Sequence, residues 1–379
     1  MRITVVGDGE EELEQALHEG LEHDLLCISG GLGPTHDDRT VELLARATGV
    51  PLQLDEQLRT GIEALSRRVA ERMRRPFADF TEGITKQATL PEGAEWVGLV
   101  GTAPAIVLEH GGCVVVALPG PPRELQELWP RVLETAPLQR LRARASARER
   151  RSLRFYGVTE SAVAQALADA GGDGDGVEVT ICARDSELHV DLFVDPGADA
   201  RADALAERLL APVGRYLYSR TEAPTAALVL GQLRERGLTL ATAESCTGGL
   251  VAARLTDIAG SSDVFVGSVV AYANGVKAAS LGVPEATLAE YGAVSKETAR
   301  AMAHGARERL GADVAVAVTG VAGPDGGTPQ KPVGLVFLHA AGPGRDLPLQ
   351  LEFAGDRETI RARATVAALH LVRRLVTET

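Results

Sequence analysis

The stretch LTLATAESCTGGLVAARL, residues 238–255, joins an apolar run typical of a buried strand to a run typical of a helix through the loop Glu-Ser-Cys-Thr-Gly-Gly. Backbone N–H groups at the start of a helix lack partners and carry the positive end of the helix dipole, so they favour a nucleophile or an anionic ligand. Ser245 is therefore a candidate functional residue. The same serine could instead be an ordinary helix cap, because serine and threonine are preferred caps in any protein. The motif alone leaves both interpretations open.

Length and composition predict a multidomain α/β protein. At about 150 residues per domain, the 379 residues predict two or three domains. A hydrophobic content of 45% with only 4% aromatic residues suits layered packing of helices on sheets. A formal net charge of -13 disfavours general binding to nucleic acid, which needs a basic surface.

The cysteines and the apolar runs predict where the protein works. Cys27, Cys113, Cys182 and Cys246 are widely spaced, show no CxxC or metal-type spacing, and follow no signal peptide. The longest apolar runs are far too short to cross a bilayer. We therefore expect a cytoplasmic protein with no membrane partner.

The first predicted domain, residues 1–141, alternates helices and strands. We interpret it as a parallel-sheet domain, in which ligand sites lie at the carboxyl ends of the strands. The segments GGLGPTHDD (30–38) and LPGPP (118–122) fall at such ends. The predicted helices are residues 10–20 and 39–48, and the predicted strands are residues 24–29, 106–108 and 113–118.

The second predicted domain, residues 142–222, is a small α+β module. It is preceded and opened by the arginine-dense run RLRARASARERRSLR (140–154), which we interpret as a solvated charged face at a domain boundary, with phosphate contacts as the alternative. A Gly/Asp linker separates its two halves. The predicted helices are residues 159–170 and 199–210, and the two alternating, strand-like runs are residues 177–183 and 188–194.

The third predicted domain, residues 223–379, is a layered α/β domain. Three loops should meet at one edge of its sheet: ESCTGG (244–249), AYANGVK (271–277) and TGVAGPDGGTPQKPVG (319–334). The last is too long for a mere connector, and long glycine-rich loops after strands commonly line ligand sites. The predicted helices are residues 226–236, 249–256, 296–310 and 357–376, and the predicted strands are residues 238–243, 264–272, 314–319, 334–340 and 347–353.

These loops hold the parts of an acyl-transfer site, which needs a nucleophile, a base and donors for an oxyanion. Ser245 can supply the nucleophile, Lys277 the base and Tyr272 a proton relay. The N–H groups of Thr247 and Gly248 can hold the oxyanion. A lysine acts as a base only if its pKa falls well below about 10.4, through burial or a nearby cation. An exposed Lys277 would exclude this interpretation.

Cys246 is the rival nucleophile, because a thiol near a helix start is more reactive than a hydroxyl at neutral pH. No histidine stands near it in the sequence as a partner. A buried, small apolar role therefore suits Cys246 better.

Together these segments resemble a known family. ESCTGG, residues 272–277, GAVS (292–295) and the Gly-Pro loop closely resemble the CinA C-terminal domain, whose members include nicotinamide mononucleotide (NMN) deamidases. GGLGPTHDD, KQATLP (86–91), VGTAP (100–104) and LPGPP resemble the CinA N-terminal domain, which is similar to molybdopterin-binding domains and is linked in the family to ADP-ribose pyrophosphatase activity. The middle block is similar to the KH-type module of the family. The resemblance covers essentially the whole chain.

The resemblance implies a reaction for the C-terminal domain. Ser245 would attack the carboxamide of NMN, releasing ammonia and leaving nicotinic acid mononucleotide, with Tyr272 and Lys277 activating the serine. This step needs no metal or other cofactor. The family also implies a homodimer. The implied oxyanion and substrate-binding residues are Thr247, Gly248, Gly249, Asn274, Thr319, Gly320, Gly323, Gly326 and Gly327.

The resemblance also implies a nucleotide site in the N-terminal domain, with ADP-ribose as its substrate. Asp37 and Asp38 are adjacent carboxylates of the kind that bind a divalent cation, although such a pair can equally cap the next helix. The implied nucleotide-site residues are Gly30, Gly31, Gly33, Thr35, Lys86, Thr102, Pro119 and Gly120.

The chain departs from the family pattern in three places. Family members usually carry Asn-Glu between the tyrosine and the lysine, whereas here Asn274 is followed by Gly275. The first strand and helix of the N-terminal domain are absent, so we expect a degraded or truncated ADP-ribose pyrophosphatase. The segment GVTE (157–160) lacks the second glycine of the GXXG loop that RNA-binding KH modules use.

Two functions of different classes follow. The first is an amidohydrolase of pyridine-nucleotide salvage. The alternative is a non-catalytic regulator of competence or of the DNA-damage response that uses its pockets to bind nucleotides.

Overall fold

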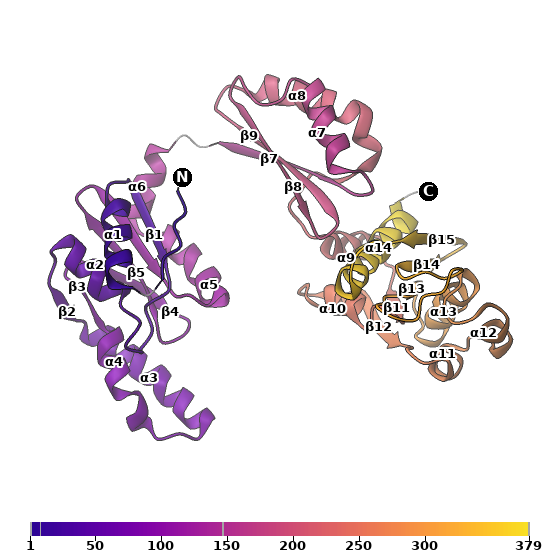
Figure 1. The fold of residues 1–379 in the computed structure, drawn as a ribbon, viewed down its shortest axis with the longest axis horizontal. Coiled ribbons are helices and arrows are strands. Elements are labelled where there is room, and N and C mark those ends of the chain that lie inside the picture. Colours follow the sequence, from indigo (N-terminus) through magenta and orange to yellow (C-terminus); the bar gives the residue numbers. More distant parts are fainter. Residues whose placement is uncertain (1, 8, 146–147, 378–379) are drawn as a thin grey trace. The chain divides into compact units, whose positions relative to one another are not determined.

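A computed structural model describes residues 2–7, 9–145 and 148–377 (Figure 1). The chain divides into two compact units, Met1–Ala147 and Arg148–Thr379. Each unit is described separately.

The first unit contains a four-stranded mixed sheet in the order β1-β6-β5-β4. β1 pairs in parallel with β6, but β6 with β5 and β5 with β4 are antiparallel. The predicted parallel sheet is therefore confirmed for β1 and β6 and wrong for β4 and β5. Gly111 and Gly112, both at positive φ, form a two-residue turn that makes a hairpin of β5 and β6. The strands are β1 (Leu25–Ser29), β4 (Glu95–Leu99), β5 (Pro104–His110) and β6 (Cys113–Leu118).

Helices cover both faces of this sheet, and β5 and β6 are therefore buried on both sides. Val107 and Val116 pack against Leu128 of α5, whereas Leu108 and Val115 pack in the cluster of α1 and α2. A second, two-stranded sheet pairs β2 (Leu52–Leu54) with β3 (Thr89–Pro91). The helices are α1 (Glu10–Leu21), α2 (Thr40–Thr48), α3 (Glu56–Met73), α4 (Thr81–Gln87), α5 (Pro122–Leu133) and α6 (Ala136–Arg144).

The second unit begins with an antiparallel sheet in the order β10-β7-β9-β8, on which two helices pack. This is the predicted small α+β module, with two strands that the sequence reading missed. The strands are β7 (Glu149–Phe155), β8 (Val177–Arg184), β9 (Glu187–Val194) and β10 (Leu217–Ser219), and the helices are α7 (Glu160–Asp169) and α8 (Asp199–Val213).

β7 overlaps the arginine-dense run, so the expectation of a solvated charged face is confirmed for the exposed residues up to Arg150 and is wrong from Ser152 onward. Leu153 and Phe155 point into the core, and Arg154 is itself buried with its guanidinium 2.8 Å from Asp191. Arg151 contacts Asp199 and other acids on the exposed side. These arginines are neutralised by acids of the same module.

The C-terminal domain holds a five-stranded sheet in the order β12-β11-β13-β14-β15, of which the first three strands are parallel. β14 and β15 form an antiparallel hairpin at one side. The strands are β11 (Leu240–Glu244), β12 (Phe265–Val270), β13 (Val314–Gly320), β14 (Leu335–Gly342) and β15 (Arg345–Glu352).

Alternate residues of the central strands face two different helical layers. Leu240 and Val316 pack with α9, α10 and α14, whereas Ala241 and Ala317 pack with α11 and α13. The helices are α9 (Thr225–Glu235), α10 (Leu250–Thr256), α11 (Asn274–Leu281), α12 (Glu285–Tyr291), α13 (Lys296–Arg309) and α14 (Arg357–Thr377). The three parallel strands end at one edge, where the loop after each begins. The segment expected to be a loop at 271–277 is helical from Asn274 onward.

A buried polar cluster joins the KH-like module to the C-terminal domain. The Glu187 carboxylate of β9 accepts hydrogen bonds from His370 Nε2 of α14, 2.7 Å away, from the Tyr218 hydroxyl and from the Thr225 hydroxyl. The Tyr156 ring stacks on His370. Burial alone would raise the pKa of Glu187, but these hydrogen bonds outweigh it and hold the pKa at about 2.

Gly305 sets the distance between α13 and α11. A Cβ atom on Gly305 would lie 1.8 Å from the carbonyl oxygen of Leu281, the last residue of α11. Any side chain here would push away the helix that carries Lys277.

We predict that Gly305→Ala and Gly231→Ala shift stability in opposite directions. Alanine in a helix interior normally stabilises by about 0.5–1 kcal/mol relative to glycine, and nothing lies within 4 Å of the Cβ position at Gly231 in α9. At Gly305 overpacking should dominate and destabilise by about 1–3 kcal/mol. Thermal unfolding of both variants measures this, and shifts of the same sign would contradict it.

Candidate active site

Ser245 and Lys277 meet at the carboxyl edge of the C-terminal sheet. Ser245 directly follows β11, and Lys277 lies in α11, which starts soon after β12. The Ser245 Oγ and Lys277 Nζ atoms are 3.0 Å apart and hydrogen-bonded. Lys277 is 0% exposed and Ser245 is 8% exposed. The condition that the sequence set for a lysine base, burial, is met.

The surroundings of Lys277 suit a neutral amine. Its Nζ donates to the carbonyl oxygens of Ala271, at 2.7 Å, and Tyr272, at 3.1 Å. Burial lowers its pKa from the ordinary value of 10.5. A neutral amine has two N–H groups, which the two carbonyls accept, and one lone pair, which is left for the Ser245 proton. The pair can therefore act as a serine nucleophile with a lysine base.

Glu244 shapes the loop that carries Ser245, a role that the sequence reading missed. Its fully buried carboxylate accepts hydrogen bonds from the N–H groups of Gly249, Val251 and Ala252, at 2.9 to 3.1 Å. These are first-turn donors of α10, where a negative charge is favoured. The sequence feature that could have predicted this cap is an acidic residue in the loop before the helix predicted at residues 249–256.

The cap changes the candidates for the oxyanion donors. The Gly249 N–H is taken by Glu244, and the Gly248 N–H donates to the Ser245 carbonyl at 3.1 Å. Both glycines have positive φ, which the tight turn requires. Within the described residues, the Thr247 N–H donates to no backbone carbonyl, and the buried Thr247 Oγ1 has no hydrogen-bond partner. Among the predicted oxyanion donors of this loop in the described residues, Thr247 is thus the one whose N–H is not taken by a backbone carbonyl or by Glu244.

Two arginines at the start of α14 tie the loops together, and the sequence reading missed both. Arg361 donates to the carbonyls of Cys246 and Thr247, at 3.0 and 2.9 Å. Arg357 donates to the Gly323 carbonyl at 2.8 Å and to the Tyr272 hydroxyl at 3.1 Å. Their spacing of four residues places both on one helix face.

The backbone carbonyl of Tyr272, not its hydroxyl, accepts the hydrogen bond from Lys277 Nζ. The side chain is 62% exposed, and its hydroxyl is bonded to Arg357. Asn274 is exposed in the first turn of α11. The relay role of Tyr272 and the substrate contact of Asn274 remain predictions.

The Gly-Pro loop meets the site through its first part. Thr319 is buried and bonds the Ala293 carbonyl at 2.7 Å, and Gly320 is packed against β14. The Gly323 carbonyl binds Arg357. Gly326 and Gly327 lie in the exposed part of the loop.

A cavity of about 500 Å³ opens between α10 and α14, next to the Ser245 loop. Arg361 belongs both to its wall and to the loop contacts. Arginine forks suit phosphate groups, so this cavity can accept the phosphate of a nucleotide. Its lining residues are Leu250, Arg254, Arg357, Glu358, Arg361, Ala362 and Thr365.

Cys246 is packed in the core of the domain. Its side chain is 5% exposed and packs in the core formed by α9, α10 and α14. Burial raises the pKa of its thiol to about 11. The thiol is therefore protonated at neutral pH, as expected for a packing residue.

The N-terminal domain brings part of its predicted nucleotide site together. Gly31, Gly33, Asp38 and Lys86 line a cavity of about 240 Å³. Lys86 Nζ donates to the Thr35 carbonyl. This cavity lies at the loop after β1, as the sequence reading expects.

Other predicted residues of the N-terminal site are placed nearby. Gly30 donates to the Leu118 carbonyl, and Gly120 lies against Gly30. The Pro119 carbonyl accepts a long hydrogen bond from Ser29, and Thr102 lies in the turn before β5.

Of the two aspartates of the N-terminal loop, Asp37 is exposed and Asp38 is half-buried. Asp38 accepts hydrogen bonds from the N–H and the hydroxyl of Thr35, at 3.0 and 2.5 Å. In the described parts of the chain, neither Asp37 nor Asp38 joins a group of three or more side chains that could hold a metal. Cation binding here stays a prediction.

Comparison with known protein families gives three matches in chain order. Residues 1–140 match the probable molybdopterin binding domain, residues 150–219 the damage-inducible protein CinA KH domain, and residues 222–376 the CinA C-terminal domain. Fold and site thus define a three-part protein whose last part carries a buried Ser-Lys pair.

The two CinA-like proteins of known sequence that follow support the same assignment. The CinA-like protein of Mycobacterium tuberculosis (strain ATCC 25177 / H37Ra) is 42% identical over 98% of this chain and 88% of its own length. The CinA-like protein of Mycobacterium marinum is 41% identical over 99% of this chain and 90% of its own length. The crystal structure of competence/damage inducible protein CihA from Agrobacterium tumefaciens matches 40% of this chain and 93% of its own, with 44% identity and a TM-score of 0.39. The chain belongs to the CinA family.

Among the helices in the described part of the chain, none combines the length and the apolar character that crossing a membrane requires.

We predict that Cys246 resists alkylation in the folded protein. Its thiol is buried and protonated at neutral pH, whereas Cys182 is exposed. After brief treatment with iodoacetamide, peptide mass spectrometry should find Cys182 modified and Cys246 unmodified until the protein is unfolded. Equal modification rates in the folded state would contradict this.

Proposed function

We propose that the C-terminal domain is an amidohydrolase that converts NMN to nicotinic acid mononucleotide and ammonia. The observation that carries the proposal is the buried contact of 3.0 Å between Ser245 Oγ and Lys277 Nζ. A serine needs such a base, because its hydroxyl is a weak nucleophile at neutral pH.

The reaction proceeds in two halves. Lys277 takes the Ser245 proton as Oγ attacks the carboxamide carbon, and Thr247 donates to the oxyanion. When the C–N bond breaks, Lys277 returns the proton to the leaving nitrogen and ammonia departs. The remaining ester is hydrolysed by water, with Lys277 again accepting a proton and passing it to Ser245.

The choice of NMN is supported by the family resemblance and by the arginine-lined cavity. NMN carries a phosphate at the end opposite its carboxamide. Arg254, Arg357 and Arg361 offer guanidinium donors for that phosphate beside the Ser245 loop. For the N-terminal domain, the cavity at Gly31, Gly33 and Lys86 supports nucleotide binding without an assigned reaction.

A nucleotide-binding regulator without catalysis is the second candidate. The observation behind it is Gly275, because family members usually carry a carboxylate at this position of the sequence and it is absent here. The two candidates differ in whether ammonia is released.

We predict that Ser245→Ala abolishes ammonia release from NMN and that Cys246→Ala retains it. Loss of a nucleophile that works with its base should cost at least about a thousandfold in kcat. Ammonia production by the purified chain measures this. The absence of turnover in both the wild type and a Gly275→Glu variant would refute the amidase and favour the regulator.

We predict that kcat/KM falls as pH falls through the pKa of Lys277, which burial places below 10.5. Below that pKa the protonated amine cannot accept the Ser245 proton. Lys277→Arg should be inactive at every pH, because a guanidinium stays protonated. A pH–rate profile, with folding followed by circular dichroism at each pH, tests this. Activity in Lys277→Arg would contradict the role of the base.

A further inference from the structure

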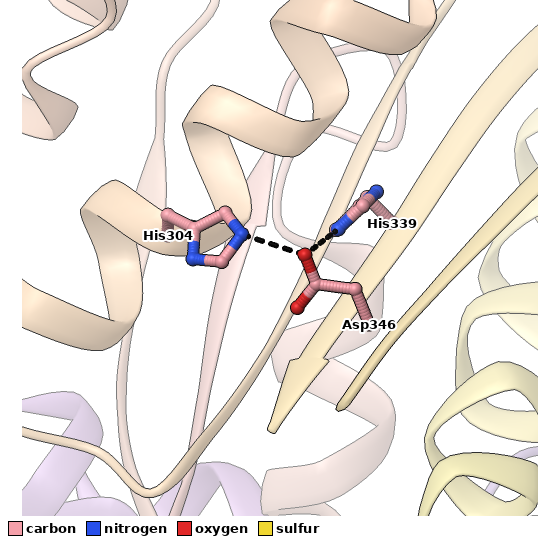
Figure 2. Close-up of side chains that lie close together, drawn as sticks. All are labelled: His304, His339 and Asp346. Carbon is pink, nitrogen blue, oxygen red and sulfur yellow. Dashed lines mark hydrogen bonds and ion pairs between the residues drawn. The ribbon is translucent and has the colours of Figure 1, made fainter. Parts of the chain in front are cut away.

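A second cluster of chemically active side chains lies in the C-terminal domain, away from Ser245. It consists of His304 on α13, His339 on β14 and Asp346 on β15 (Figure 2). His339 pairs with Ala317 in the middle of β13, whereas the active-site loops leave the carboxyl ends of the strands. The proposed amidase mechanism does not use this cluster.

Both imidazole rings point at one carboxylate oxygen (Figure 2). Asp346 Oδ2 lies 2.8 Å from His304 Nε2 and 3.1 Å from His339 Nε2. One potential ligand atom from each residue lies within 4.8 Å of the other two. Three metal-binding donors thus converge on a small volume.

The fold brings these residues together from both sides of one packing interface. Asp346 pairs with Ala341, which is two residues from His339 and therefore on the same face of the β14-β15 hairpin. α13 packs against that face through its own apolar residues, including Met302 and Ala303.

His339 is the least well satisfied donor of the cluster. Its side chain is 5% exposed, and its buried Nε2 atom lies 3.1 Å from Asp346 Oδ2 without the geometry of a good hydrogen bond. Buried polar atoms in native proteins are almost always well satisfied, so this contact leaves room for a better partner such as an ion.

We propose that His304, His339 and Asp346 bind a divalent transition-metal ion, with Zn²⁺ as the preferred ion. Two imidazole nitrogens and one carboxylate oxygen are donors that Zn²⁺ takes, whereas Mg²⁺ and Ca²⁺ prefer oxygen alone. Tetrahedral Zn²⁺ with bonds of about 2.0–2.1 Å places its ligand atoms about 3.3 Å apart. The two short distances to Asp346 would widen slightly to reach that spacing. Water would fill the fourth position.

The ion would lock α13 onto the β14-β15 hairpin. Arg300 lies near the carboxylate, with its Nε 3.6 Å from Asp346 Oδ2, and is mostly exposed. It can swing into solvent when the ion neutralises Asp346. The site therefore competes with an internal ion pair of the apo protein.

The test uses the full chain after a chelator has removed bound metal. Isothermal titration calorimetry measures its affinity for Zn²⁺, and thermal unfolding with and without Zn²⁺ measures the change in stability. The wild type should bind Zn²⁺ at this site and gain thermal stability, since an ion that binds the folded state stabilises it. His304→Ala and Asp346→Asn should weaken this binding at least tenfold and lose the gain.

His36→Ala is the matched control, because it removes a fully exposed histidine of the first unit that contributes no ligand to the cluster. It should bind Zn²⁺ at the cluster as the wild type does. Asp346→Asn keeps the side-chain shape, so it tests the site even if His304→Ala fails to fold. Unchanged affinity in Asp346→Asn, or no binding by the wild type, would overturn the proposal.

The proposal and the amidase can fail separately. Ammonia release from NMN should persist in the chelated wild type, because no step of the amidase uses the ion. Zn²⁺ binding should likewise persist in Ser245→Ala. Loss of Zn²⁺ binding in Ser245→Ala would place the ion at the active site and contradict the assignment.

Discussion

The buried amino group of Lys277 is the constraint on which the candidate active site depends. An ammonium or amine without partners in an apolar interior costs several kcal/mol, so the fold must supply acceptors. The carbonyls of Ala271 and Tyr272, at the end of β12, do this, and Ser245 completes the set. One side chain thereby fixes the positions of β12, α11 and the loop after β11. The same burial lowers its pKa and makes the serine reactive.

The Ser245 loop is held from two sides by opposite charges. The Glu244 carboxylate accepts hydrogen bonds from N–H groups at the start of α10, and Arg361 donates hydrogen bonds to the carbonyls of Cys246 and Thr247. Each charge satisfies backbone groups that a tight turn would otherwise leave unpaired. The loop conformation that these hydrogen bonds hold also decides which side chain can act as the nucleophile. The turn directs the Ser245 hydroxyl to Lys277 and the Cys246 thiol into the core.

The sequence predicted the central strands and the convergence of their loops because β11 and β13 are continuous apolar runs that end in glycine-rich segments. It missed α11, since Asn274 and Gly275 are weak helix formers and the buried side of this short helix is formed in part by a lysine. It missed Arg361, whose contacts span more than a hundred residues of sequence and leave no local pattern. The metal-binding cluster likewise draws on three separate elements without a motif.

The glycine at position 275, where family members usually carry glutamate, affects the pKa of Lys277 less than its nearness in the sequence implies. Residues two apart on a helix do not face each other, so Gly275 and Lys277 lie on different sides of α11. Gly275 is exposed, with no described heavy atom within 4 Å of its Cβ position, whereas Lys277 is fully buried. A glutamate at 275 would extend into solvent, where its charge is screened. Burial is the main cause that lowers the pKa of Lys277, and the glycine leaves that burial intact.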